Sequence, residues 1–162
     1  MKNLNALEFT GPSLWALLIL RVLIGWHFLY EGMVKLVNPD WSSVGFLLDS
    51  QGMFAKFFIS MASSPGMLNV IDILNTWGLI LVGLGLILGI LNKFATWGGI
   101  ALLALYFLSH PPMVGFKFSA PSEGSYLWVN KNLVEMSALF VLYLFPTSHI
   151  IGIDRFFRTK GK

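Results

Sequence analysis

Four ionisable side chains interrupt the first long apolar run of this chain, residues 14–37: Arg21, His27, Glu31 and Lys35. A charged group at the centre of a bilayer costs from ~3 to over ~10 kcal/mol, so we expect this run to do more than anchor the chain. Guanidinium and ammonium groups bind anions, whereas imidazole and carboxylate groups transfer protons. The run therefore predicts an intramembrane site that combines anion binding with proton transfer.

Helical spacing places these four side chains on about one third of the helix surface, because each residue turns by about 100°. His27, Glu31 and Lys35 follow one another at intervals of four residues, so neighbouring side chains can touch. We expect this polar face to lie against protein or water rather than lipid. A single histidine on an apolar helix is also commonly a hydrogen-bonded core residue, and both interpretations of His27 stay open.

Later apolar runs contribute polar side chains that could meet this face. The candidate proton carriers, taken as catalytic residues, are His27, Glu31 and Glu135. The candidate substrate-binding residues are Arg21, Lys35, Asp72, Asn75, His110 and Asn132. Together they predict a polar pocket that opens toward the outer leaflet, with Arg21 deepest. Such a pocket suits an anion, the head group of a quinone, or both.

Structural roles are the alternative for several of these residues. Arg21 could serve only to neutralise Glu135 or Asp72 inside a helix bundle. Lys35 lies at the end of its run and could extend its ammonium group to the membrane surface. His110 precedes two prolines and could cap a helix end.

Other chemistries find little support in the residue types. The chain has no cysteine, which excludes a persulfide or a thiolate metal site on this polypeptide. His27 and His110 belong to different apolar runs, without the short His or Glu spacing of a metal site. No glycine-rich phosphate loop is present, and the basic residues near the end of the chain favour membrane orientation over nucleic-acid binding. We expect no metal and no nucleic-acid partner.

Composition predicts an integral membrane protein with one domain over residues 1–162. Hydrophobic residues make up 56% of the chain and charged residues 12%, against roughly 25% charged residues in soluble domains. Four runs approach the ~20 apolar residues that a membrane span needs. They cover residues 13–37, 68–91, 94–109 and 127–146. We expect an all-α bundle of four transmembrane helices, with the first run retained rather than cleaved.

The region between the first two runs is too polar to span a bilayer. Residues 41–60 predict one or two short amphipathic helices that lie at the membrane interface or re-enter the bundle. Trp41, Tyr126 and Trp128 lie near predicted span ends, as in an aromatic belt. Small residues in the second and third runs predict close helix contacts. These are Gly78, Gly83, Gly85, Gly89, Gly98 and Gly99.

Basic residues indicate the orientation of the chain. Four spans place both termini on one side of the membrane, where Lys2, Lys93, Arg155, Arg158, Lys160 and Lys162 would gather. Lys56 and Lys117 would lie on the other side, with Lys35 and Lys131 as further candidates for that side. Because basic residues favour the cytoplasmic side, we expect a multi-pass protein of the inner (cytoplasmic) membrane with both termini in the cytoplasm.

Several short motifs, in this order, resemble the DoxX/DoxD family. The first run carries Leu20-Arg21-Val22, Gly25, Phe28-Leu29, Glu31-Gly32 and Lys35-Leu36. Asn38-Pro39-Asp40-Trp41, Gly45-Phe46-Leu47 and the closing Gly152-Ile153-Asp154 follow. The resemblance implies a membrane protein with four spans. It also implies likeness to the DoxD subunit of thiosulfate:quinone oxidoreductase, which works with a small partner subunit.

The resemblance and the residues combine into one hypothesis and one rival. Arg21 and Lys35 would bind thiosulfate, a quinone would accept electrons, and His27, Glu31 or Glu135 would deliver protons. The partners would be the lipid bilayer, a DoxA-like subunit and further copies of the chain. The rival is a non-enzymatic membrane accessory or assembly protein that binds a quinone or lipid, or a small transporter.

Overall fold

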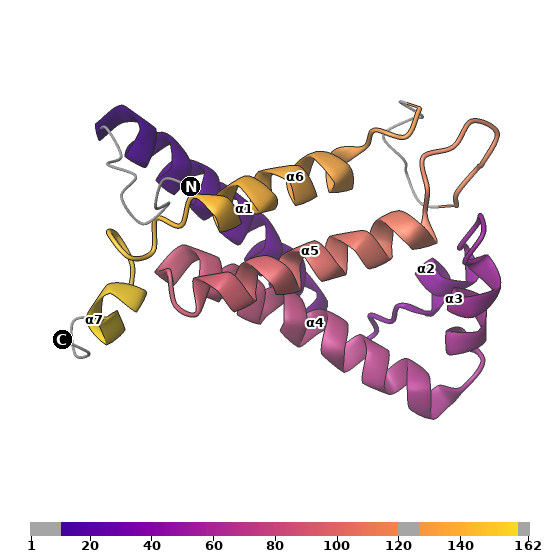
Figure 1. The fold of residues 1–162 in the computed structure, drawn as a ribbon. Coiled ribbons are helices and arrows are strands. Elements are labelled where there is room, and N and C mark those ends of the chain that lie inside the picture. Colours follow the sequence, from indigo (N-terminus) through magenta and orange to yellow (C-terminus); the bar gives the residue numbers. More distant parts are fainter. Residues whose placement is uncertain (1–10, 120–126, 159–162) are drawn as a thin grey trace.

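The computed structural model describes residues 11–119 and 127–158, and these form seven helices and no strand (Figure 1). In order they are α1 (Gly11–Val37), α2 (Val44–Leu48), α3 (Ala55–Ala62), α4 (Pro65–Leu88), α5 (Asn92–Ser109), α6 (Lys131–Leu144) and α7 (Asp154–Arg158). The all-helical prediction is confirmed. Lys2, Tyr126, Lys160 and Lys162, used above for orientation and the aromatic belt, lie outside the described residues.

Two of the described helices are long and apolar enough to cross a membrane. They are α1, with 27 residues, and α4, with 24 residues. The helix α5 has 18 residues and α6 has 14. Since ~20 apolar residues cover the bilayer core, α1 and α4 are spans by length and composition, as predicted for the first two runs.

The predicted fourth span was wrong at its start, because α6 begins at Lys131 rather than at residue 127. Leu127 and Trp128 have φ angles of 50° and 77°, which a right-handed helix does not allow. Asn130 then caps the helix, and its side chain accepts a hydrogen bond from the Leu133 amide at 3.1 Å. At the other end the helix stops at Leu144, two residues before Pro146.

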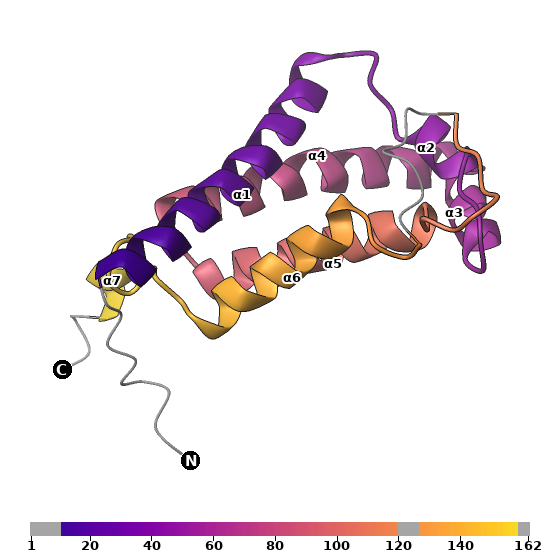
Figure 2. The same cartoon turned by 90° about the horizontal axis from the view of Figure 1, so that it is seen from above.

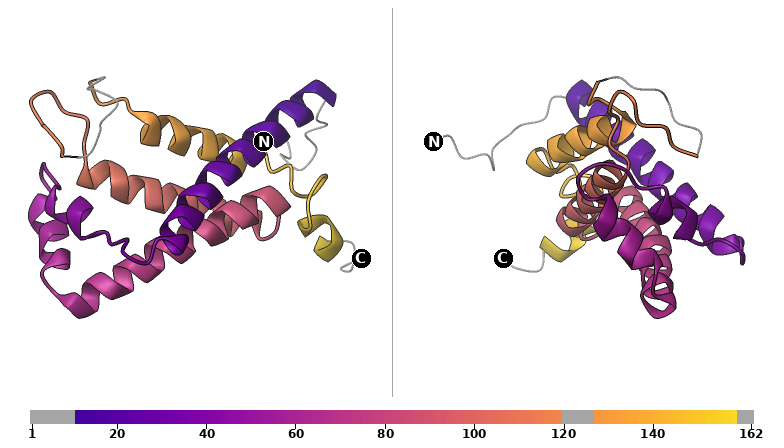
Figure 3. Two further views of the ribbon diagram at one scale, coloured as in Figure 1. Left: turned by 180° about the vertical axis from the view of Figure 1, so that it is seen from behind. Right: turned by 90° about the vertical axis from the view of Figure 1, so that its right-hand side faces the viewer.

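Four long helices pack on one another in a fixed order. The helix α4 packs against both α1 and α5, and α6 packs against α5 and α1. The short helices α2 and α3 lie at one end of the molecule, and α7 lies at the opposite end, which is also the end where α1 begins (Figure 2). The described chain therefore begins and ends at the same end, and α1 runs diagonally across the other long helices (Figure 3).

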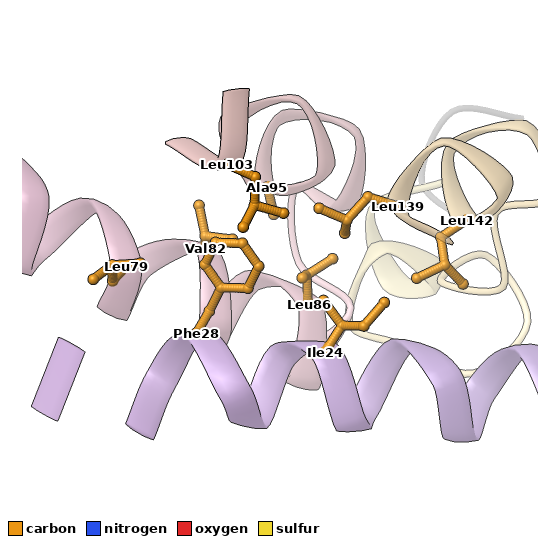
Figure 4. Packing of buried hydrophobic residues seen from close by; sticks show 9 residues of the cluster. All are labelled: Ile24, Phe28, Leu79, Val82, Leu86, Ala95, Leu103, Leu139 and Leu142. Carbon is orange, nitrogen blue, oxygen red and sulfur yellow. The ribbon is translucent and has the colours of Figure 1, made fainter. Parts of the chain in front are cut away.

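The apolar core lies where all four long helices meet (Figure 4). It consists of Ile24, Phe28, Leu79, Val82, Leu86, Ala95, Leu103, Leu139 and Leu142. Outside this core, large apolar side chains are exposed on every long helix, among them Leu23, Leu81, Phe94 and Phe140. Such extensive apolar exposure is typical of a surface that contacts lipid.

Glycines bring the backbones of α1 and α4 together. A Cβ atom at Gly83 would lie 2.5 Å from the Leu29 amide nitrogen and 2.7 Å from the Gly25 carbonyl oxygen. A Cβ atom at Gly32 would lie 2.9 Å from the Ile80 amide nitrogen. No larger residue fits these positions without moving a helix, which confirms the predicted packing role at Gly83. Gly78 meets only ordinary side-chain contacts at 3.6 Å.

Candidate functional site

A cavity of about 320 Å³, with both polar and apolar residues in its wall, lies between α1, α4, α5, the residues around α2, and the start of α6. Its wall contains six of the nine predicted site residues. They are His27, Glu31, Lys35, Asn75, His110 and Asn132. Trp41, Ser42, Ser43, Phe46, Tyr106 and Lys131 also line it. The structure thus gathers most of the polar residues that the sequence placed on separate apolar runs.

Lys35 is held in the cavity by side chains from three other elements. Its ammonium group donates a hydrogen bond to Asn75 Oδ1 at 2.9 Å and lies 5.0 Å from the centre of the Trp41 ring. It lies 5.6 Å from the centre of the Tyr106 ring, and Asn75 donates a hydrogen bond to the Tyr106 hydroxyl at 2.6 Å. Both ring contacts are cation–π interactions. An ammonium group has three donors, so Lys35 keeps hydrogen-bonding capacity for a ligand in the cavity.

The lysine position also changes two of the sequence interpretations. Lys35 is half-buried and lines the cavity, so it does not simply extend to the membrane surface. Trp41 was expected at the membrane interface, but its half-buried ring forms part of the cavity wall. Tyr106 was not among the predicted site residues. The signal that could have found it was its spacing of four residues before His110.

A hydrogen bond between His27 and Glu135 joins α1 to α6, and it becomes an ion pair when the histidine is protonated. The distance from His27 Nδ1 to Glu135 Oε1 is 2.8 Å, with 41% of the histidine side chain exposed and 12% of the glutamate side chain. His27 lines the cavity, whereas Glu135 lies behind it. Glu31, one turn further along α1, is exposed and also lines the cavity. All three predicted proton carriers therefore lie in or beside the same cavity wall.

His110 follows the last residue of α5 and closes the cavity on the side of α2. Its Nδ1 atom is 3.0 Å from Ser109 Oγ, its Nε2 atom is 3.7 Å from Asp49 Oδ2, and its ring stacks on Phe46 at 3.9 Å. Burial lowers the pKa of His110 below its usual value, and the opposing attraction of the Asp49 carboxylate is the smaller effect. The ring is therefore neutral at pH 7. Its backbone amide also closes α5 by bonding to the Tyr106 carbonyl, so the capping role exists as well.

Arg21 does not reach the cavity, which corrects the expectation of an arginine at the bottom of the pocket. Its guanidinium group donates to Thr147 Oγ1 at 2.9 Å and to the Ile151 carbonyl at 2.7 Å, and the residue is 2% exposed. The pairing with Glu135 or Asp72 is not formed. Six residues of helix separate Arg21 from His27, a rise of about 9 Å, which carries Arg21 toward the opposite end of α1.

Asp72 also lies outside the cavity wall and acts on a neighbouring segment. Its carboxylate accepts hydrogen bonds from Ser42 Oγ at 2.8 Å and from the Ser43 amide at 2.9 Å. Ser42 and Ser43 do line the cavity, so Asp72 fixes part of the wall from behind. Sequence reasoning missed both serines because nothing in a short linker indicates that it folds against a distant carboxylate.

The wall composition defines what the cavity can bind. Lys35 and Lys131 supply positive charge and Glu31 supplies one negative charge, while Asn132, Tyr106 and Ser42 supply neutral hydrogen-bonding groups. An anion or a carbonyl-bearing ring suits such a wall. Within residues 11–119 and 127–158, no three His, Asp or Glu side chains are grouped so that they could hold a metal ion.

Comparison with known proteins gives one match. A family model described as DoxX matches residues 16–111, which is more than half of the chain and runs from α1 through α5. The residues that α6 contributes to the site, such as Asn132 and Glu135, lie outside the matched range. No curated protein and no solved structure matches the chain.

Proposed function

The chain belongs to the DoxX family, and we propose that it is a membrane oxidoreductase subunit that oxidises thiosulfate, or a related small sulfur anion, with a quinone as electron acceptor. The observation that carries the proposal is the position of Lys35 in a polar cavity beside the His27–Glu135 pair. The cavity joins a positive charge for an anion to groups that exchange protons, as the reaction requires.

In this proposal the four long helices, α1, α4, α5 and α6, all span the membrane. The helices α1 and α4 are long and apolar, and α5 and α6 pack along them with exposed apolar side chains of their own. Arg155 belongs to α7, and Lys93 follows Asn92, which bonds to Asp154 of α7. Lys56 belongs to α3, and the Lys117 carbonyl accepts a hydrogen bond from Gln51, between α2 and α3. Lys35 and Lys131 line the cavity. By the preference of basic residues for the cytoplasm, the proposal places both termini on the cytoplasmic side of the membrane, with the cavity opening outward.

Anion binding falls to Lys35 in this proposal. Arg21 is engaged with Thr147 and Ile151 at the far end of α1, so it does not act on a ligand in the cavity. Lys131 and Asn132 line the same cavity as Lys35 and are further candidate contacts for an anion there. Charge attraction strengthens in a partly desolvated cavity, which favours a small dianion over a neutral solute.

The proposed reaction balances with two anions and one quinone. Oxidation of two thiosulfate ions forms one S–S bond and releases two electrons, which together with two protons reduce the quinone to a quinol. A bound quinone supplies the two-electron acceptor, and the rings of Trp41, Phe46 and Tyr106 with the Asn75 amide fit such a planar, carbonyl-bearing group. The absence of cysteine is compatible with direct coupling between two substrate ions.

Proton supply is the role of the histidine and glutamates. The His27–Glu135 pair can hold a proton between Nδ1 and the carboxylate at 2.8 Å, within the range for proton transfer. Glu31 offers a second, exposed carboxylate on the cavity wall. The proposed small partner subunit, a separate polypeptide, completes the enzyme.

Reconstitution tests this function. The protein and its partner are placed in liposomes, and quinone reduction is followed on addition of thiosulfate. We expect turnover that Lys35→Met abolishes, while Lys56→Met, at an exposed lysine of α3, leaves it unchanged. Absence of turnover by the wild-type complex would overturn the proposal.

A non-enzymatic accessory protein that binds a quinone or lipid is the second candidate. The observation in its favour is that Arg21, Asp72, Lys35 and Glu135 all bond to other parts of the same chain. These hydrogen bonds can stabilise the fold even if the protein catalyses no reaction. This candidate predicts purified protein that retains a quinone or lipid yet shows no thiosulfate-dependent reduction.

A further inference from the structure

A second hollow of about 650 Å³ lies between α1 and α6, on the opposite side of the His27–Glu135 pair from the cavity. We call it the α1–α6 groove. It is open along its length and mostly apolar, and α6 lies beside α1 at this point (Figure 1). Its apolar residues are Leu20, Leu23, Ile24, Val129, Val134 and Ala138.

The groove and the cavity share part of their walls. His27 and Lys131 line both hollows, and Glu135, bonded to His27 at 2.8 Å, lines the groove alone. A molecule that lies along the groove therefore has its nearer end at the cavity. The two hollows adjoin at His27 and Lys131, next to the His27–Glu135 pair.

Polarity changes along the groove in one direction. His27 on α1 and Lys131 on α6 mark the polar end, which adjoins the cavity. Leu20 and Ala138 lie seven residues further along these two antiparallel helices, a rise of about 10 Å. The polar end suits a head group with hydrogen-bonding atoms, and the apolar end suits a hydrocarbon chain.

We propose that the α1–α6 groove receives the isoprenoid tail of the quinone, with the ring directed past His27 and Glu135 into the cavity. This inference rests on the proposed function, because it takes the quinone as its occupant. The open side of the groove faces the region that lipid fills around α1 and α6, so a tailed molecule enters sideways from the bilayer.

Groove-filling variants test the tail site against a matched control. Val134 is 59% exposed and lines the groove, whereas Val141, 39% exposed, lies on the same helix beyond it. We expect Val134→Trp to raise the KM for decyl-quinone about tenfold, the effect of withdrawing roughly two methylene groups from an apolar surface. The KM values for a tail-less benzoquinone and for thiosulfate should not change, and Val141→Trp should have no effect. Equal losses with both quinones would overturn the tail site.

A photoreactive probe gives a readout that does not depend on turnover. A quinone with a diazirine at the end of a decyl tail should label peptides that contain residues 20–24 and 134–138, and Leu23→Trp, on the α1 wall, should weaken the labelling. Labelling elsewhere would overturn the tail site even if the enzyme turns over. Labelling in the groove without any turnover would support the tail site and remove the proposed redox function. A phospholipid that carries a diazirine provides a control for general lipid binding. If it labels the groove equally well and decyl-quinone does not displace it, the groove binds lipid in general and the inference is overturned.

Discussion

The imidazole of His27 lies 2.8 Å from the carboxylate of Glu135, so one hydrogen-bonded pair joins α1 to α6 at the place where the cavity and the α1–α6 groove adjoin. The two residues are 108 positions apart in the chain. A pair that joins two helices and also borders both hollows can influence stability and chemistry at once. Variants at this pair should therefore affect both.

Glu135→Ala should lower both the stability and the proposed activity. The variant removes the partner of His27 at a glutamate that is only 12% exposed, and loss of a hydrogen bond to a charged group costs about 1.5–3 kcal/mol. Glu135→Gln keeps a hydrogen-bonding side chain, so it should recover most of the melting temperature but little of the proton-coupled turnover. Equal turnover in the two variants and the wild type would remove Glu135 from the mechanism.

Sequence reasoning predicted the features that depend on local pattern. Hydropathy located α1 and α4 to within three residues at each end, and the four-residue spacing of His27, Glu31 and Lys35 put all three on one wall. The partner of Arg21 depends instead on how residues 147–151 fold back after Pro146, which no helical period encodes. The hydrogen bonds of Arg21 therefore depend on the tertiary fold and could not be predicted from the sequence pattern.

Arg21→Met should loosen the C-terminal segment without changing the cavity. Two hydrogen bonds from a buried guanidinium, to Thr147 and Ile151, would be lost, at a cost of about 2–4 kcal/mol. Hydrogen exchange should increase at residues 147–158, whereas the affinity for thiosulfate should stay the same. Arg21→Lys should rescue only part of the protection, because an ammonium group lacks the planar fork that reaches two acceptors. A loss of anion affinity with unchanged exchange would restore Arg21 as a ligand.

Gly83→Ala should destabilise the contact between α1 and α4. The added Cβ atom would lie 2.5 Å from the Leu29 amide nitrogen, so the helices must separate, and overpacking of this kind costs about 1–3 kcal/mol. Gly66→Ala is the matched control on the same helix, since nothing lies within 4 Å of its Cβ position. Denaturant unfolding in detergent should separate the two variants. Similar midpoints would mean that α1 and α4 do not approach this closely.

Acidification should destabilise the protein through His110. Burial lowers the pKa of this ring in the folded state, whereas the unfolded chain titrates near about 6.5. Between those two values the unfolded state binds more protons, so stability is highest above about pH 6.5 and falls as the pH drops through this window. Thermal unfolding measured from neutral to acidic pH should show this slope in the wild type.

Two variants assign the pH slope to His110. His110→Gln removes the titrating group, so the part of the slope below about pH 6.5 that this ring contributes should disappear. Asp49→Asn removes the carboxylate that lies 3.7 Å from Nε2 and favours the charged ring, so the pKa of His110 should fall further and the slope should extend to lower pH. A slope unchanged in His110→Gln would mean that another group governs the acid sensitivity. A slope that contracts in Asp49→Asn would show that the carboxylate does not stabilise the protonated ring.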